Sequence, residues 1–198
     1  MKNKYTYANS KNLLNFFTEA GLLKRVKRSG WWVVGIKEAE SVAEHSFRTA
    51  IVAYALAKME GVSPYEAVMM ALFNDIHEAR INDLHKMGQR YIDFTKAEKH
   101  AFLEQMLPLP RVIKEELTSL HQGYSKQKSL PAIIARDADI LECLIQAKEY
   151  HCQGYISAKE FFRKAPGFLK TKSARALWKA VKTWDINDWW IKLAKFER

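Results

Sequence analysis

The segment from residue 72 to residue 83 concentrates side chains capable of acid–base or metal chemistry on a stretch that otherwise has the pattern of an apolar helix. Asp75 and Glu78 are three positions apart, so a helix places both on one face. Asp83 follows just beyond the expected end of that helix. Burying several carboxylates is costly unless a cation or hydrogen bonds compensate. The simpler alternative is a solvated helix face.

Polar groups in two other apolar stretches weaken that alternative. His45 lies inside the apolar helix expected over residues 41–60, and Asp137 and Asp139 lie in the first part of the apolar helix expected over residues 133–147. Taken alone, the histidine is typical of a satisfied core residue, and the aspartates of a capping pair. One histidine and separated aspartates from three helices can also converge on one divalent ion.

Helical periodicity extends through most of the chain and predicts an all-α fold of seven to nine helices in one globular domain. Ser41 and Glu44 have the spacing of a capping box, which predicts a helix start there. Ser63 and Pro64 predict the next start, with Ser63 as the N-cap. Residues 31–36 are the one strand-like stretch, and without a partner strand we expect an extended loop. The other predicted helices cover residues 11–24, 95–107, 111–122, 130–151, 157–164, 172–183 and 187–196.

Composition narrows the class of protein. The chain has 198 residues, of which 48% are apolar and 27% charged, which suits one folded domain. Two cysteines exclude a disulfide framework, and no apolar run is long enough to cross a membrane. No apolar leader follows the N-terminal methionine. We therefore expect a cytoplasmic protein with free thiols and no membrane partner.

The net charge of +10 is unevenly distributed. Residues 1–37 carry 8 basic and 1 acidic side chains, residues 38–158 carry 13 and 17, and residues 159–198 carry 11 and 4. Basic ends with aromatic residues are one signature of nucleic-acid binding. The aromatic residues recur near helical spacing, however, so we interpret them as packing residues and do not expect a nucleic-acid partner: Trp178, Trp184, Trp189 and Trp190.

Three motifs, in this order and spacing, resemble those of the HD-domain metal-dependent phosphohydrolases. The similar branch comprises small single-domain proteins like the bacterial 5′-deoxyribonucleotidase and its eukaryotic HD-domain-containing relatives. The resemblance covers about residues 10–155, and the helical extension of about 156–198 is less diagnostic. The motifs are Glu40-Ser41-Val42-Ala43-Glu44-His45-Ser46, Asn74-Asp75-x-x-Glu78-x-x-x-x-Asp83 and Ala138-Asp139-x-Leu141-Glu142.

The resemblance implies a metal-dependent phosphomonoester hydrolase that converts nucleoside 5′-monophosphates, with deoxyribonucleotides preferred, to nucleoside and phosphate. It also implies an all-helical fold, a homodimer and a small-molecule nucleotide partner. The divalent ion, Mn²⁺, Co²⁺ or Mg²⁺, would be held by His45, Asn74, Asp75 and Asp139. Acid–base work falls to Glu78 and Asp83, phosphate contact to Arg28, and the wall of the nucleotide pocket to Trp31.

The chain departs from this family in the doublet that names it. The first residue is asparagine, Asn74, where the family has histidine. An amide oxygen is a harder and weaker ligand than imidazole, which favours Mn²⁺ or Mg²⁺ over zinc-like ions. Three outcomes stay open: weaker metal binding, loss of stable metal, or rescue by His77. A degenerate protein that binds a nucleotide or another phosphate compound without efficient turnover is the alternative function.

Overall fold

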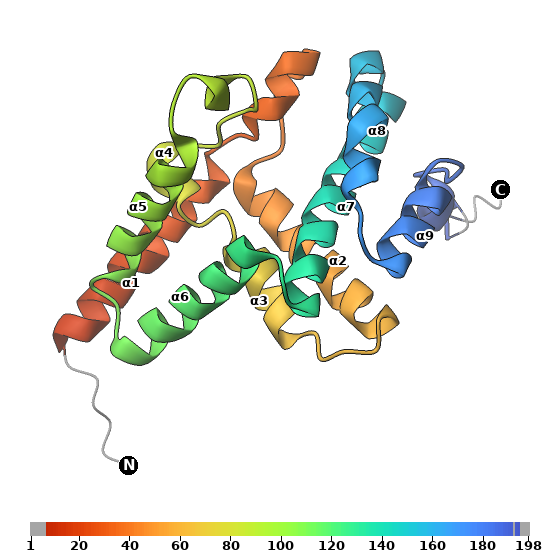
Figure 1. Cartoon of the computed structure of the whole chain (residues 1–198). Helices are drawn as coiled ribbons and strands as arrows, with labels where there is room; N and C mark the ends of the chain where they lie inside the picture. The colour runs from red at the N-terminus through yellow and green to blue at the C-terminus, as the bar shows by residue number, and fades with distance from the viewer. Residues whose placement is uncertain (1–6, 192, 195–198) are drawn as a thin grey trace.

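A computed structural model describes residues 7–191, 193 and 194 of the chain. All regular structure in these residues is helical, which confirms the all-α class (Figure 1). The described residues also include an isolated antiparallel β-bridge between Lys27 and Ser41. That bridge ties the segment before the first long core helix to the N-terminal part of the chain.

Three helices form the centre of the core. Helix α2 (Val42–Met59), helix α3 (Tyr65–Phe73) and helix α7 (Leu130–Cys152) pack against one another (Figure 1). Their contact faces are rich in alanine, whose small side chain permits close helix approach, and in leucine, which fills the space between the helices. The fully buried residues at their centre include Ala53, Leu56, Ala57, Ala67, Ala138, Leu141 and Leu144.

Two capped helix starts fix the position of the site residues along α2 and α7. The predicted capping box is confirmed, because Ser41 accepts a hydrogen bond from the Glu44 amide while Glu44 accepts one from the Ser41 amide. Helix α7 begins after Ser129, whose hydroxyl accepts a hydrogen bond from the Ala132 amide at 3.3 Å. His45 therefore lies in the first turn of α2.

The segment after α2 differs from the prediction. Helix α3 begins in the predicted segment, but its N-cap is Pro64, which makes no side-chain capping bond, so the assignment of Ser63 as the N-cap was wrong. Helix α3 ends at Phe73, and turns over residues 74–77 lead into the short helix α4 (Glu78–Ile81). The Glu78 amide bonds to the Asp75 carbonyl at 3.0 Å, three residues back, which interrupts the α-helical ladder.

This interruption raises the number of helices. The described residues contain ten α-helices rather than seven to nine, because some of the predicted helices are divided by turns or 3₁₀ segments. The turns also redirect the chain at the acidic segment, so Asp75 and Glu78 do not share one continuous helix as the spacing suggested.

The predicted extended loop over residues 31–36 is also wrong. Residues Ser29–Val34 form a 3₁₀ helix, η2, which ends at Gly35. Gly35 has φ +88°, and its amide bonds to the Trp32 carbonyl at 3.0 Å. Trp31 is buried by this turn, and that burial favours the compact form over an extended one.

The remaining N-terminal and central elements surround the core. The 3₁₀ helix η3 lies in the 83–94 segment, which is otherwise irregular. Bonds from Asn12 to the Pro108 carbonyl and from Gln105 to Glu19 connect the first helix to the 94–108 region. These elements are α1 (Tyr7–Gly21), η1 (Leu22–Lys24), η3 (Gly88–Arg90), α5 (Phe94–Met106) and α6 (Arg111–Lys126).

The C-terminal part is a series of short helices beside α7 (Figure 1). Trp178 is buried as predicted, whereas Trp189 and Trp190 are 69% and 41% exposed, so the packing prediction was wrong for those two. Of the helix predicted over residues 187–196, the structure shows only the first part. Residues 192, 195 and 196 of that range lie outside the described residues. The elements are η4 (Ile156–Glu160), α8 (Phe161–Lys164), η5 (Ala165–Phe168), α9 (Lys172–Val181) and α10 (Asp188–Ile191).

Two features bear on the expected class. Both cysteines, Cys143 and Cys152, are free thiols, as predicted. Within the part of the chain that the structure covers, each helix is too short or too polar to cross a lipid bilayer.

Candidate functional site

A cavity of about 1300 Å³ opens between the α3–α4 turns, α5, α6, α7 and the first C-terminal helices. Seven of the eight predicted site residues line it: Arg28, Trp31, Asn74, Asp75, Glu78, Asp83 and Asp139. The eighth, His45, is 1% exposed. The structure therefore gathers residues from η2, α2, the α3–α4 turns and α7 at one place.

His45 stands between two carboxylates. Its Nε2 atom lies 3.1 Å from Asp139 Oδ1 and 3.7 Å from Asp75 Oδ2. Two ligands of one divalent ion are separated by about 3.0–3.4 Å when each bond is near 2.1 Å. Asp75 and Asp139 line the cavity, so this side of the imidazole faces the space that a substrate would enter.

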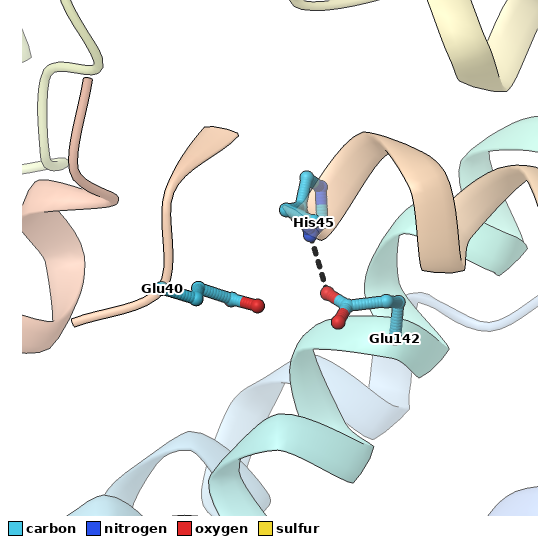
Figure 2. Close-up of side chains that lie close together, drawn as sticks. All are labelled: Glu40, His45 and Glu142. Atoms are coloured by element: carbon cyan, nitrogen blue, oxygen red, sulfur yellow. Dashed lines mark hydrogen bonds and ion pairs between the residues drawn. The ribbon is translucent and has the colours of Figure 1, made fainter. Parts of the chain in front are cut away.

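The other ring nitrogen of His45 faces a second acidic pair (Figure 2). His45 Nδ1 forms a short hydrogen bond with Glu142, and one donor atom each of Glu40, His45 and Glu142 lie within 4.8 Å of one another. Glu142 also accepts a bond from Arg48 at 2.8 Å. Among the described residues, the cavity lining does not include Glu40 or Glu142. They lie behind His45, where a carboxylate fixes the orientation of a metal-binding imidazole.

These neighbours alter the protonation of the buried groups. Burial opposes the charged imidazolium, yet the hydrogen bonds to Asp139 and Glu142 raise the pKa of His45 to about 10. Burial, reinforced by Glu142, raises the pKa of Glu40 to about 7. Despite its burial, Asp139 has a pKa well below its usual range because His45 and Arg136 stabilise the carboxylate. In this state His45 is an imidazolium, so a divalent ion that binds its Nε2 atom must displace a proton, and the carboxyl groups of Asp75 and Asp139 then face that ion.

The positive side chain of Arg28 lies among the acidic residues. Arg28 Nη1 is 3.6 Å from Asp75 Oδ2, and Arg28 Nε is 3.7 Å from Asp83 Oδ2. Asp83 Oδ2 also accepts a hydrogen bond from the Ser29 amide at 3.1 Å. Asp83 therefore fixes the start of η2, and with it Arg28, against the α4 region.

Glu78 is the most isolated carboxyl group of the site. It is 6% exposed, and its Oε2 atom has no hydrogen-bond partner among the described residues. Burial, followed by the charges of Asp75 and Asp83, raises its pKa to about 10. A buried carboxyl group without a fixed partner on the cavity wall is suited to exchange a proton with a bound molecule.

The predicted ligand Asn74 is adjacent to the metal-binding candidates. Its Nδ2 atom donates to Asp75 Oδ1 at 2.6 Å, and the residue lines the cavity. His77 is directed elsewhere, since its Nε2 atom lies 3.3 Å from Glu98 Oε1, and no ion pair among the described residues joins it to Asp75 or Asp139. As placed, His77 does not replace the missing imidazole at position 74.

Sequence reasoning missed two residues that contact Asp139. Arg136 Nη1 donates to Asp139 Oδ2 at 2.8 Å, and the Tyr124 hydroxyl lies 3.5 Å from the same oxygen. The spacing of Arg136 and Asp139 on one helix was a signal for the first contact. Tyr124 comes from α6, and no local pattern indicates it. Trp31 was predicted, but it is only 2% exposed and its Nε1 donates to Glu40 at 3.0 Å, so it packs into the cavity wall.

Comparison with known proteins identifies the family. The HD-domain family model matches residues 20–181, which is well over half of the chain. The chain belongs to the HD-domain family. A Bos taurus relative, 5′-deoxynucleotidase HDDC2, is 32% identical over 146 residues, covering 71% of this chain and 69% of that protein. The Dictyostelium discoideum protein of the same name is 30% identical over 170 residues, covering 79% and 89%.

A solved structure shares the fold of this HD-domain chain. It is a conserved hypothetical protein from Pyrococcus furiosus, 32% identical in sequence with a TM-score of 0.72. The match covers 86% of this chain and 97% of the Pyrococcus chain. The donors around His45 fit the divalent ion expected of an HD-domain phosphohydrolase: an imidazole nitrogen and carboxylate oxygens in a buried acidic setting.

Proposed function

We propose that this HD-domain protein is a metal-dependent phosphohydrolase that converts nucleoside 5′-monophosphates, preferentially deoxyribonucleotides, to nucleoside and phosphate. One observation carries the proposal. His45 Nε2 faces Asp75 and Asp139 at the wall of a cavity that also presents Arg28 and the unpartnered carboxyl group of Glu78. The names of the bovine and Dictyostelium relatives, 5′-deoxynucleotidase, support the same substrate class.

His45, Asp75, Asp139 and the amide oxygen of Asn74 would hold the divalent ion. When bound, such an ion lowers the pKa of a coordinated water and neutralises charge that develops on the phosphoryl group. Mn²⁺, Mg²⁺ and Co²⁺ suit this set, since oxygen ligands outnumber nitrogen ligands. Glu142 keeps the His45 ring in the orientation that directs Nε2 to Asp75 and Asp139.

Arg28 is the residue that we assign to the phosphate group. Its guanidinium offers a planar set of donors to phosphate oxygens. It is already held beside the site by Asp75 and Asp83, so phosphate binding needs little reordering of the side chain. Lys86 and Arg136 also line the cavity and add positive charge for an anionic substrate.

Glu78 and Asp83 are assigned to proton transfer. In its carboxylate form, which a divalent ion bound beside Asp75 would favour by lowering the pKa of about 10, Glu78 takes a proton from the attacking water as the oxygen of that water forms the new bond to phosphorus. Asp83 gives a proton to the 5′-oxygen as the phosphorus–oxygen bond breaks, which releases the nucleoside. The raised pKa of Asp83, which follows from burial and from the nearby charge of Asp75, favours the protonated form that this role requires.

Substitution of Glu78 tests the assignment. Glu78→Gln keeps the shape of the side chain and removes its capacity to accept a proton, so phosphate release should fall by about 10²–10⁴-fold. Glu115→Gln on α6 is a matched control, because Glu115 is exposed and pairs with Arg111 away from the cavity. Equal phosphate release by Glu78→Gln and the parent protein would refute the role of Glu78.

Two finer properties belong to this proposal. We expect the protein to act in the cytoplasm, which its free thiols favour, and to form a homodimer, which rests on its resemblance to the family. Light scattering coupled to size-exclusion chromatography tests the second expectation, and a mass near the 23.0 kDa of one chain would contradict it.

A further inference from the structure

A second group of metal-binding side chains lines the same cavity. His77 precedes α4, Glu98 lies on α5 and His121 lies on α6. None of the three belongs to the set around His45. The cavity wall formed by the start of α4, α5 and α6 thus carries two imidazoles and a carboxylate that the proposed hydrolysis does not use.

His77 is buried without a hydrogen bond. It is 3% exposed, and among the described residues neither of its ring nitrogens has a hydrogen-bond partner. A buried polar atom without a partner costs free energy, so a native protein rarely keeps one without a ligand or a function. The two buried ring nitrogens of His77, which have no partner among the described residues, therefore point to a ligand bound beside this side chain.

The neighbouring carboxylate is at the separation of two ligands of one ion. His77 Nε2 lies 3.3 Å from Glu98 Oε1, although the two make no hydrogen bond. Two ligands arranged tetrahedrally around Zn²⁺, each about 2.1 Å from the ion, are about 3.4 Å apart. The pair therefore has the spacing for a shared ion.

His121 supplies a second imidazole. Its ring centroid is 6.4 Å from that of His77, and the two rings are nearly perpendicular at 87°. Phe102 stacks on the His121 ring at 3.9 Å, which restricts the plane of the imidazole. As placed, the ligand atoms of His77, Glu98 and His121 do not all lie within 4.8 Å of one another, so the His121 ring must move towards the pair for all three to bind one ion.

We propose that His77, Glu98 and His121 form a second divalent metal site, selective for Zn²⁺ and similar borderline ions. Two nitrogen ligands and one oxygen ligand are a set that Zn²⁺ favours, in contrast to the oxygen-rich set around His45. Three protein ligands leave one position open, and the cavity lies on that side. A water molecule or an anionic oxygen of the substrate completes the coordination.

The test measures bound metal rather than activity. The full chain is stripped with a chelator and dialysed against Zn²⁺, and the bound ion is counted by elemental analysis. The same chain loaded with Co²⁺ gives visible absorption bands that report on the ligands. The variants are His121→Gln and Glu98→Gln. His100→Gln is the control, because the His100 side chain is 76% exposed on α5.

We expect two Zn²⁺ ions per parent chain and per His100→Gln chain. The His121→Gln and Glu98→Gln variants should bind one ion, with affinity at the second site weakened by at least about 100-fold. Glu98→Gln keeps the test informative if His121→Gln disturbs the stack with Phe102. Far-ultraviolet circular dichroism confirms that each variant is folded.

Asp139→Asn separates this site from the one around His45. An ion that is lost in His121→Gln and retained in Asp139→Asn supports the second site, even if the hydrolase assignment fails. A parent chain that binds no Zn²⁺ overturns the second site. So does a parent chain whose single ion is retained in His121→Gln and Glu98→Gln and lost in Asp139→Asn.

Discussion

Two aspartates of helix α7, two residues apart, have opposite environments. Asp137 is 1% exposed and accepts hydrogen bonds from the Lys170 amide, the Thr171 amide and the Thr171 hydroxyl at 2.6–3.0 Å. Asp139 lies on the cavity, and its partners are ionisable side chains, His45 and Arg136. One side of α7 holds the C-terminal extension, and the other forms the site.

The hydrogen-bond partners of each aspartate indicate whether it stabilises the fold or belongs to the functional site. Backbone amides have a fixed place and leave Asp137 no capacity for a ligand. Side chains of His45 and Arg136 keep Asp139 charged beside an open space, where a cation or substrate can bind. The same residue type in the same helix therefore serves the fold in one position and the site in the other.

Asp139→Asn should have the largest effect. It replaces a proposed carboxylate ligand by a weaker amide oxygen and removes half of the negative charge that faces His45 Nε2, so phosphate release should fall by about 10³-fold or more. The unfolding free energy should fall as well, because His45 and Arg136 lose their carboxylate partner. A steady-state assay paired with urea denaturation measures both. Normal activity in a folded Asp139→Asn variant would contradict the assignment of Asp139 to the site, since Asp139 would then have only a structural role, like Asp137.

Asp137→Asn should lower the stability of the protein and leave its activity almost unchanged. An amide group cannot accept all of the hydrogen bonds from Lys170 and Thr171, so we expect a loss of about 3 kcal/mol in the unfolding free energy. Activity of the folded fraction should stay within about twofold of the parent. A variant as stable as the parent but inactive would show that the two aspartates have been assigned the wrong way round.

Asn74→His tests the departure from the family doublet. Imidazole is a better ligand than an amide oxygen for Co²⁺ and Zn²⁺, so affinity for these ions at the His45 site should rise by about 10-fold. Asn74→Ala is the companion variant, and it should bind Mn²⁺ more weakly than the parent. Competition with a metal-sensitive dye measures each affinity. Unchanged affinities in both variants would exclude position 74 from the ligand set.

Glu60→Gln should have the smallest effect. It tests only how the C-terminal extension is attached to the core. Glu60 accepts a hydrogen bond from the Ser173 amide at 2.8 Å, near the start of α9, and contacts with Ser173 lower its pKa below 4.5. A carboxyl group whose pKa is lowered by folding stabilises the protein when the pH is above the pKa of that group in the unfolded state. This contribution is lost as the pH falls through the pKa of the group in the folded state. Solvent limits it to less than about 1 kcal/mol.

The pH dependence of unfolding measures this contribution. Parent and Glu60→Gln should differ by a small amount in urea denaturation at pH 7, and the difference should disappear near pH 3. A difference that is constant across this range would show that the charge of Glu60 does not anchor α9.

The sequence predicted those parts that depend on local rules. The capping box at Ser41 placed His45 in the first turn of α2, and the spacing of acidic residues placed Glu78 and Asp83 near Asp75. The resemblance to a family supplied Arg28, which lies far from these residues in the chain and has no local signal of its own. These residues were predicted because short patterns or a known motif order carry them.

Other parts depend on tertiary contacts that short patterns do not encode. Residues 29–34 coil into a 3₁₀ helix because Trp31 packs between Tyr150 and Phe161, which are distant in sequence. The turns at residues 74–77 interrupt a helix that the periodicity of the apolar residues predicts to be continuous. Tyr124 reaches Asp139 from α6, and no spacing rule connects the two. The packing pattern of the C-terminal tryptophans likewise did not show that Trp189 is exposed.

A phosphate-release assay with controlled metal content tests the central claim most directly. The full chain is stripped of metal, reloaded separately with Mn²⁺, Co²⁺, Mg²⁺ and Zn²⁺, and offered a panel of 5′-ribonucleotides and 5′-deoxyribonucleotides. Our account predicts release that requires metal, is faster from deoxyribonucleotides and is lost in Asp139→Asn. No release from any nucleotide with any of the four ions would contradict it.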